Sequence, residues 1–248
     1  MSVQFREPSF CAQHRSDEQS IRAVIFEPAG VLYDVTPRRR WLWQLVTRLG
    51  LQMSYDEFIR PWETVFLPAV HRGERSYRDA MHDFLGSLTL SPPHVTEVEA
   101  AVPLRGHPLE RGIRPLPGVA RALGQISAAG ISLAALCDCP WTGNEFKEQL
   151  DGMGLGYFGA VMTSIDLGSI KPNSQNYEAI ANVLGLPPQQ CVMVSNRLAD
   201  LTGAMTQGWR TVGFATPVEH TIDAYVVSAA EMAKTILQWP TGTLKAVG

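Results

Sequence analysis

The sequence predicts an α/β fold: a mostly parallel sheet with helices on both faces, interrupted by an inserted block of helices. Two observations carry this prediction. From about residue 111 onward, short apolar segments alternate with segments of helical periodicity, which is typical of a parallel sheet covered by helices. An earlier apolar segment, Ala23–Phe26, is separated from these by residues 36–110, where the patterns are helical. We therefore expect an α/β core of residues 21–35 and 111–248, an α-helical cap of residues 36–110, and a loosely ordered lead-in of residues 1–20.

Strands of the core are expected where apolar, β-favouring residues cluster between turn-forming residues. The expected strands are Ala23–Phe26, Ile131–Cys137, Val161–Thr163, Cys191–Ser195, Thr211–Phe214 and Tyr225–Val227. The expected helices that accompany them cover residues 117–129, 142–152, 173–184, 198–207 and 229–238.

Helices of the inserted block are expected to begin at residues that cap helix ends. Thr36 followed by Pro37 is typical of an N-cap and the first helical position. The pairs at residues 54–57 and 76–79 have the spacing of capping boxes and predict two further helices. Residues 91–110 are rich in proline and glycine, so we expect them to form a linker back to the core.

Two prolines and two tryptophans of the block carry more detailed predictions. Pro61 and Pro68 should kink or interrupt the second helix. Trp41 fits the apolar stripe of the first helix, whereas Trp43, two residues later, should face the cleft or a partner. The histidines of the block and linker have no spacing typical of ligands, and we expect no site from them; they are His71, His82, His94 and His107.

Composition excludes several function classes. The chain has 248 residues, a formal net charge of −3 and 45% hydrophobic residues, without a basic stripe for nucleic acid. No apolar run approaches the roughly 20 residues that a membrane span needs. The N-terminal segment is polar and lacks the apolar stretch of a secretory signal. We therefore expect a cytoplasmic protein with neither a nucleic acid nor a membrane as partner, in which the four cysteines are free thiols.

Four segments that end or follow expected strands carry the polar residues of a candidate site. They are FEPAGVL, ALCDCP, SIKPNSQNY and VMVSNRLADLTGA, in that order along the chain. In order and spacing they resemble the four motifs of the haloacid dehalogenase superfamily, of the type with a helical cap inserted after the first strand. The resemblance covers residues 22 to about 240 and implies a Rossmann-like core with its site at the carboxyl ends of the strands.

The first motif departs from the family's pattern, D-x-D-G-[TV]-L. In the family, the first Asp attacks phosphorus and the second transfers a proton to the leaving group; Glu27 and Ala29 stand at these positions. Glu27 keeps a carboxylate on a longer arm, and a displacement of about 1 Å in a reacting group costs roughly a hundredfold in rate. Ala29 transfers no proton, and a positioned general acid typically contributes about 10²–10⁴.

The other motifs are kept in part. Cys137 and Asp138 replace the family's Ser or Thr, often followed by Asn, that binds phosphoryl oxygens; the thiol is a weaker donor and Asp138 would repel phosphate. Lys171 matches the lysine that steadies the phosphate. Of the two acids that hold Mg²⁺ in the family, the first is Asn196 here and the second remains as Asp200. The resemblance thus implies a Mg²⁺ site of Glu27, Asn196 and Asp200 that binds the ion weakly, if at all.

Three functions are compatible with these residues. The first is a catalytically impaired or inactive relative, a pseudo-phosphatase that binds a ligand or regulates a partner, in which Lys171 only neutralises Glu27 or Asp200. The second is a weak Mg²⁺-dependent phosphomonoesterase that uses Glu27 as its nucleophile. The third is a metal-free enzyme similar to the 2-haloacid dehalogenases. The segment SNRLAD resembles part of the fourth motif of those enzymes, and an arginine of residues 38–40 would receive the halide or carboxylate.

Further expectations concern cofactors, ligands and thiols. Phosphonoacetaldehyde hydrolases also carry Ala at the position of Ala29 but need a cap lysine, and residues 36–110 contain none. The resemblance implies a small phosphate or carboxylate ligand, and the apolar cap leaves a homodimer or protein partner open.

The C-x-C pair of Cys137 and Cys139 lacks zinc-finger spacing, and Cys191 should lie at the opposite strand end, so we expect no zinc site. Lys171 would favour a reactive thiolate at Cys137, but we expect a buried, inert thiol.

Overall fold

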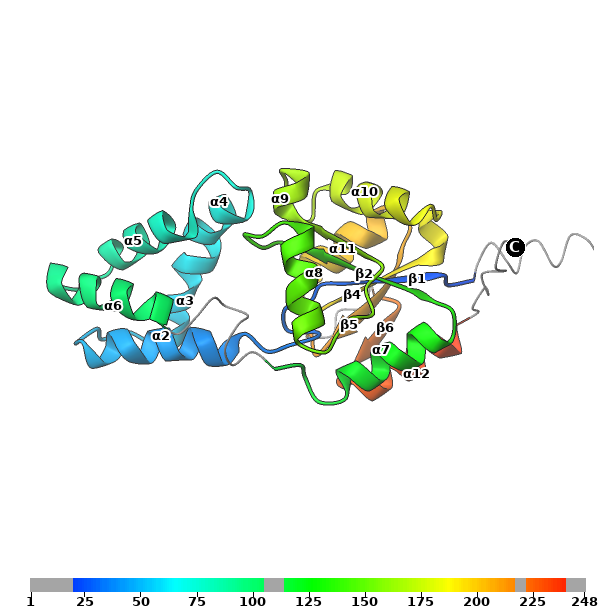
Figure 1. Cartoon of the computed structure of the whole chain (residues 1–248), viewed down its shortest axis with the longest axis horizontal. Coiled ribbons are helices and arrows are strands. Elements are labelled where there is room, and N and C mark those ends of the chain that lie inside the picture. Colours follow the sequence, from blue (N-terminus) through cyan, green and yellow to red (C-terminus); the bar gives the residue numbers. More distant parts are fainter. Residues whose placement is uncertain (1–19, 105–113, 217–221, 240–248) are drawn as a thin grey trace, which may run out of the picture.

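The computed structural model describes residues 20–104, 114–216 and 222–239, and its centre is a parallel sheet (Figure 1). Within these residues six strands pair in the order β3-β2-β1-β4-β5-β6, and every neighbouring pair is parallel. The strands are β1 (Ala23–Phe26), β2 (Ser132–Cys137), β3 (Ala160–Thr163), β4 (Cys191–Ser195), β5 (Arg210–Phe214) and β6 (Ala224–Val226). The predicted α/β fold class is confirmed, and the carboxyl ends of β1, β2 and β4 lie next to one another.

Helices cover both faces of the sheet (Figure 1). They are α7 (Val119–Ala128), α8 (Gly143–Gly152), α9 (Ser164–Leu167), α10 (Ser174–Leu184), the 3₁₀ turn η2 (Pro188–Gln190), α11 (Leu198–Thr206) and α12 (Ala229–Gln238). Successive residues of β1 point to opposite faces: Val24 and Phe26 join one buried apolar cluster, and Ala23 and Ile25 join the other. Burial on both faces explains why the strands are continuous apolar runs in the sequence.

A group of helices between β1 and β2 in the sequence has an apolar cluster of its own. These helices are α2 (Thr36–Arg48), α3 (Tyr55–Pro61), the π-helix η1 (Trp62–Phe66), α4 (Leu67–His71), α5 (Tyr77–Ser87) and α6 (Pro92–Leu104). Phe58 and Phe84 are fully buried at its centre, with ring centroids 5.1 Å apart. We call α2 to α6 the helical unit; it lies to one side of the sheet in Figure 1.

The prolines of the helical unit act as the sequence predicts. The helix that starts at Tyr55 reaches Pro61 and continues as a wider π-helical turn, and Pro68 lies in the first turn of α4. The capping box before α3 is complete: the Ser54 N–H donates to Glu57 at 2.8 Å and the Glu57 N–H donates to the Ser54 hydroxyl at 3.3 Å.

Three expectations for this part of the chain are wrong. Residues 92–104 of the expected linker form helix α6, because two prolines at its start fall where helix N–H groups need no internal partner. Thr36 lies inside α2 rather than at its N-cap, and its N–H donates to Asp34 at 2.8 Å. Trp43 packs inside the helical unit, donating from its indole N–H to the carbonyl of Met53 at 3.1 Å.

Two segments with sequence-based expectations lie mostly or partly outside the described residues. The lead-in of residues 1–20, with Cys11, lies outside the described residues except for Ser20, which is buried. Residues 105–110 of the expected linker also lie outside them. Among the residues that are described, no helix has the length and apolar character needed to cross a membrane.

Candidate active site

The turn after β1 holds Glu27 at the carboxyl end of the strand. The Glu27 N–H donates to the carbonyl of Val194 at 2.9 Å, so its backbone continues the pairing of β1 with β4. The carboxylate accepts a hydrogen bond from the Ala29 N–H at 3.2 Å. Gly30 has a φ of +79°, and a Cβ there would collide with the side-chain amide of Asn196. The sequence therefore needs glycine at this turn whether or not Glu27 reacts.

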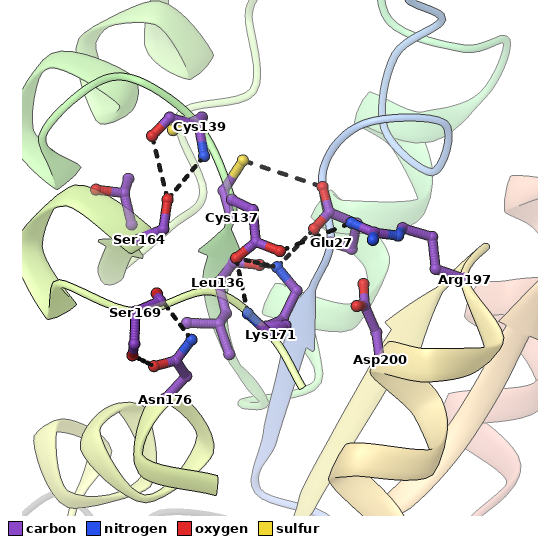
Figure 2. Close-up of polar contacts among 12 residues, drawn as sticks. Glu27, Leu136, Cys137, Cys139, Ser164, Ser169, Lys171, Asn176, Arg197 and Asp200 are labelled. Carbon is purple, nitrogen blue, oxygen red and sulfur yellow. Dashed lines mark hydrogen bonds and ion pairs between the residues drawn. The ribbon is translucent and has the colours of Figure 1, made fainter. Parts of the chain in front are cut away.

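Lys171 is the centre of a buried ion-pair network (Figure 2). Its Nζ lies 2.8 Å from Glu27 Oε2, 3.3 Å from Asp138 Oδ1 and 3.0 Å from the carbonyl of Leu136. The Lys171 side chain is fully buried, and an ammonium group has three N–H donors. The lysine thus donates a hydrogen bond to the Leu136 carbonyl and forms ion pairs with both carboxylates.

Asp138 binds the lysine twice and also approaches a second cation. Its Oδ1 accepts a hydrogen bond from the Lys171 backbone N–H at 3.1 Å in addition to the contact with Nζ. Its Oδ2 lies 3.6 Å from a guanidinium nitrogen of Arg197. Only 5% of the Asp138 side chain is exposed. A carboxylate of the protein itself thus occupies the space between Lys171 and Arg197.

Burial and charge shift the pKa values of this network. Burial raises the pKa of Glu27 to about 7, because the charged form loses its hydration, although the neighbouring Lys171 opposes the shift. Burial alone would lower the pKa of Lys171, but Glu27, Asp138 and Asp200 together hold it well above its usual range. At neutral pH the lysine is therefore charged, while Glu27 is partly protonated.

Asn196, directly after β4, and Asp200, in the first turn of α11, flank the network. Asp200 is fully buried; its Oδ2 accepts a hydrogen bond from the Ser195 hydroxyl at 3.0 Å, and its Oδ1 has no hydrogen-bond partner among the described residues. Asn196 is exposed, with its amide beside Gly30. Lys171 pairs with Glu27 as one hypothesis expects, but its second carboxylate is Asp138 and not Asp200.

The expected Mg²⁺ ligands do not fit the ion in this arrangement. Mg²⁺ prefers charged oxygen ligands in near-octahedral geometry. Of the three residues, Glu27 is bound to Lys171, Asn196 is neutral, and Asp200 alone has a free carboxylate oxygen. Over the described parts of the chain, no group of three or more His, Cys, Asp or Glu residues is placed to hold a metal ion. A divalent cation would have to share the carboxylate of Glu27 with the ammonium of Lys171.

The two cysteines at the end of β2, Cys137 and Cys139, are buried thiols. Cys137 Sγ lies 4.0 Å from Glu27 Oε1. The hydrogen bond with Cys139 and burial raise the pKa of Cys137 well above its usual range, and both effects outweigh the nearby lysine. Cys191 starts β4 and is also buried, and burial raises its pKa to about 12. The thiols of Cys137 and Cys191 are therefore protonated at neutral pH and are poor nucleophiles.

A cavity of about 170 Å³ lies between the helical unit and the loops that follow β1 and β2. Ala29, Cys137 and Asp138 form its floor, so it opens directly above the network. Trp41 lines this cavity, while Trp43 does not, which reverses the predicted orientations of the two tryptophans. We call this space the cap cavity.

The cap cavity also contains polar groups that sequence reasoning missed or left open. His71, at the end of α4, faces it, although nothing in the histidine spacing indicated a site. Of the three arginines expected to reach the ligand, Arg39 lines the cavity, paired with Glu63 at 2.5 Å. Arg40 lies over the ring of Tyr55 instead, and nothing is described of the Arg38 side chain.

His71 should make stability depend on pH. Burial lowers its pKa from 6.5 to about 4, so it is neutral at pH 7. Between these two values the unfolded chain binds more protons than the folded protein, so stability falls as the pH drops from 6.5 to 4. We expect His71→Gln to reduce this loss by about 2 kcal/mol, judged by urea unfolding at pH 7 and pH 4.5. The same loss of stability between pH 7 and pH 4.5 in His71→Gln and in the wild type would refute the assignment.

A comparison with models of protein families identifies the family of this chain. Residues 21–205 match the model of a hydrolase family described as haloacid dehalogenase-like hydrolase. The chain belongs to this family. The predicted resemblance is therefore confirmed at the level of the family.

Two curated relatives of this haloacid dehalogenase-like protein have different names. A phosphoglycolate phosphatase of Salmonella choleraesuis is 25% identical over 211 residues, which cover 79% of this chain and 81% of the relative. The chloroplast protein SUPPRESSOR OF QUENCHING 1 of Arabidopsis thaliana is 20% identical over 207 residues, which cover 83% of this chain. The match spans only 19% of that plant protein.

Solved structures of the family share the fold of this haloacid dehalogenase-like chain. A crystal structure of a dehalogenase superposes with a TM-score of 0.67 at 20% identity, covering 87% of this chain and 97% of the other. The L-2-haloacid dehalogenase from Xanthobacter autotrophicus, with chloropropionic acid covalently bound, superposes with a TM-score of 0.63 at 18% identity, covering 88% and 99%. At these identities the likeness concerns the fold alone.

Proposed function

We propose that this haloacid dehalogenase-like protein binds a small organic ligand in the cap cavity and is impaired in phosphomonoester hydrolysis. One observation carries the proposal. Asp138 engages both the backbone N–H and the ammonium of Lys171, and approaches Arg197 at 3.6 Å. The carboxylate thus takes up the donors that would otherwise bind the oxygens of a phosphoryl group.

Two further features support impairment. A phosphate entering above Lys171 would meet the negative charge of Asp138, which stands in place of the Asn often found there. Ala29 lines the cavity where the family's general acid stands, and its methyl group transfers no proton. Because Glu27 is also bound by Lys171 and partly protonated at pH 7, it is a weak nucleophile.

A second candidate function is metal-free hydrolysis at carbon, with Glu27 as the nucleophile. The position of Arg39 favours it, because this arginine lines the cap cavity where the resemblance to 2-haloacid dehalogenases implies a receiver for carboxylate or halide. Glu27 adjoins the floor of the same cavity through Cys137. Chloride release from 2-chloropropionate without added metal tests this function, since it should vanish in Glu27→Gln if the carboxylate attacks carbon.

Phosphate release from a broad panel of phosphomonoesters tests the first proposal. We expect wild type and Glu27→Ala to remain at the same background rate, with and without Mg²⁺. Circular dichroism on both proteins verifies that they are folded during the assay. Metal-dependent turnover by wild type that disappears in Glu27→Ala would refute the impairment and identify Glu27 as a working nucleophile.

A further inference from the structure

We infer that the cap cavity selects a compact aromatic ligand that carries a hydrogen-bond donor and no negative charge, and that Asp138 sets this selectivity against anions. The inference rests on the proposed function, because it takes the network of Lys171 and Asp138 as the resting state of the site. It adds the chemical class of the ligand and names Asp138 as the residue that discriminates against anionic ligands.

The walls of the cap cavity favour a flat apolar ring. Six of its lining side chains are aromatic: Tyr33, Trp41, Phe58, Trp62, Tyr77 and Trp141. Aromatic side chains bind rings through stacked and edge-to-face contacts and add large apolar area. The volume of about 170 Å³ is close to that of an apolar cavity of about 150 Å³ that holds benzene. The cavity therefore has room for one ring with a short substituent.

The charges around the floor disfavour an anion. Lys171 is already paired with the carboxylates of Glu27 and Asp138, and Asp138 also lies 3.6 Å from the largely solvated Arg197. Arg39 lines the cavity but is already paired with Glu63 at 2.5 Å. A carboxylate or phosphate on the ligand would lie beside the buried carboxylate of Asp138, while Lys171 and Arg39 are already paired.

The same floor offers a carboxylate oxygen that can accept a hydrogen bond from the ligand. Asp138 is the acidic residue that lines the cap cavity, and its Oδ2, at 3.6 Å from Arg197, makes only a loose ion pair. A carboxylate oxygen accepts several hydrogen bonds, so Oδ2 retains capacity for a hydroxyl or N–H of the ligand. His71, neutral at pH 7, adds a second polar group without adding charge.

A matched series of one-ring ligands tests the inference. We would titrate wild type with benzyl alcohol, benzylamine and benzoate by ligand-observed NMR, without Mg²⁺. We expect benzyl alcohol to bind at least about 10-fold more tightly than benzoate. Asp138→Asn should narrow this ratio to about threefold or less, because the amide keeps the shape and removes the charge. Tighter binding of benzoate than of benzyl alcohol or of benzylamine by wild type would overturn the inference.

A second variant keeps the test decisive if Asp138→Asn does not fold. Val102 in α6 lines the cap cavity, so Val102→Trp should fill it and lower the affinity for benzyl alcohol at least about 10-fold. Val183 on α10 is 61% exposed, and Val183→Trp is the matched control that should bind as wild type does. Equal binding by both variants would place the ring elsewhere. Phosphate release measured separately distinguishes failure of the proposed function from failure of this inference.

Discussion

Replacing Lys171 with methionine is expected to lower the free energy of unfolding by about 3–5 kcal/mol. The substitution keeps an unbranched side chain, one atom shorter, but removes the charge that Glu27 and Asp138 share at 2.8 Å and 3.3 Å. Both carboxylates are only 5% exposed, so water does not replace the lost partner. Urea unfolding at pH 7 measures the loss, which corresponds to a decrease in Tm on the order of 10 °C.

A second variant shows whether the loss comes from unpaired charge or from packing. In Lys171→Met combined with Glu27→Gln and Asp138→Asn, no carboxylate of the pair remains to be stranded, and we expect more than half of the stability to return. Glu27→Gln and Asp138→Asn without the lysine change provide the reference for this cycle. A cost of less than about 1 kcal/mol for Lys171→Met alone would mean that the network does not stabilise the fold as described.

Restoring four residues of the family's motifs should produce a phosphatase. The changes are Glu27→Asp, Ala29→Asp, Asp138→Asn and Asn196→Asp. We expect phosphate release from p-nitrophenyl phosphate, in the presence of Mg²⁺, to exceed the wild-type rate at least about 100-fold, since a positioned general acid alone contributes about 10²–10⁴. The variant also frees the donors of Lys171 and supplies the acidic groups that Mg²⁺ prefers.

The control for this gain is the same set of changes with Glu27→Asn in place of Glu27→Asp. It has the restored acid and metal ligand but no nucleophile, so its rate should stay at the wild-type background. A folded four-residue variant that is no faster than this control would show that these four positions do not account for the impairment.

The sequence predicted the strands of the core well because their residues are buried on both faces. Apolar runs such as the one at Ala23–Phe26 carry a strong local signal of that burial. The helix at residues 92–104 was missed for the opposite reason. Proline and glycine are common in linkers, yet Pro92 and Pro93 are compatible with a first helical turn, and the packing of Val98 in the helical unit decides the outcome.

The sequence predicted which residues form the site but not which of them contact one another. Strand order brings β2 beside β1, and this adjacency places Cys137 and Asp138 next to Glu27 across 110 residues of sequence. No local sequence pattern predicts that Asp138 contacts both the backbone N–H and the ammonium of Lys171. His71 reaches the cap cavity only because the helical unit folds over the sheet edge, so its sequence spacing carried no signal.

A crystal structure of the protein grown with Mg²⁺ and tungstate tests the central claim most directly, because tungstate mimics phosphate and scatters strongly. We predict no tungstate at Lys171, with Asp138 still within hydrogen-bond distance of the Lys171 N–H and Nζ. Tungstate bound to Lys171, with the Asp138 side chain displaced and Mg²⁺ between Glu27 and Asp200, would contradict the claim that the protein's own carboxylate fills the phosphate position.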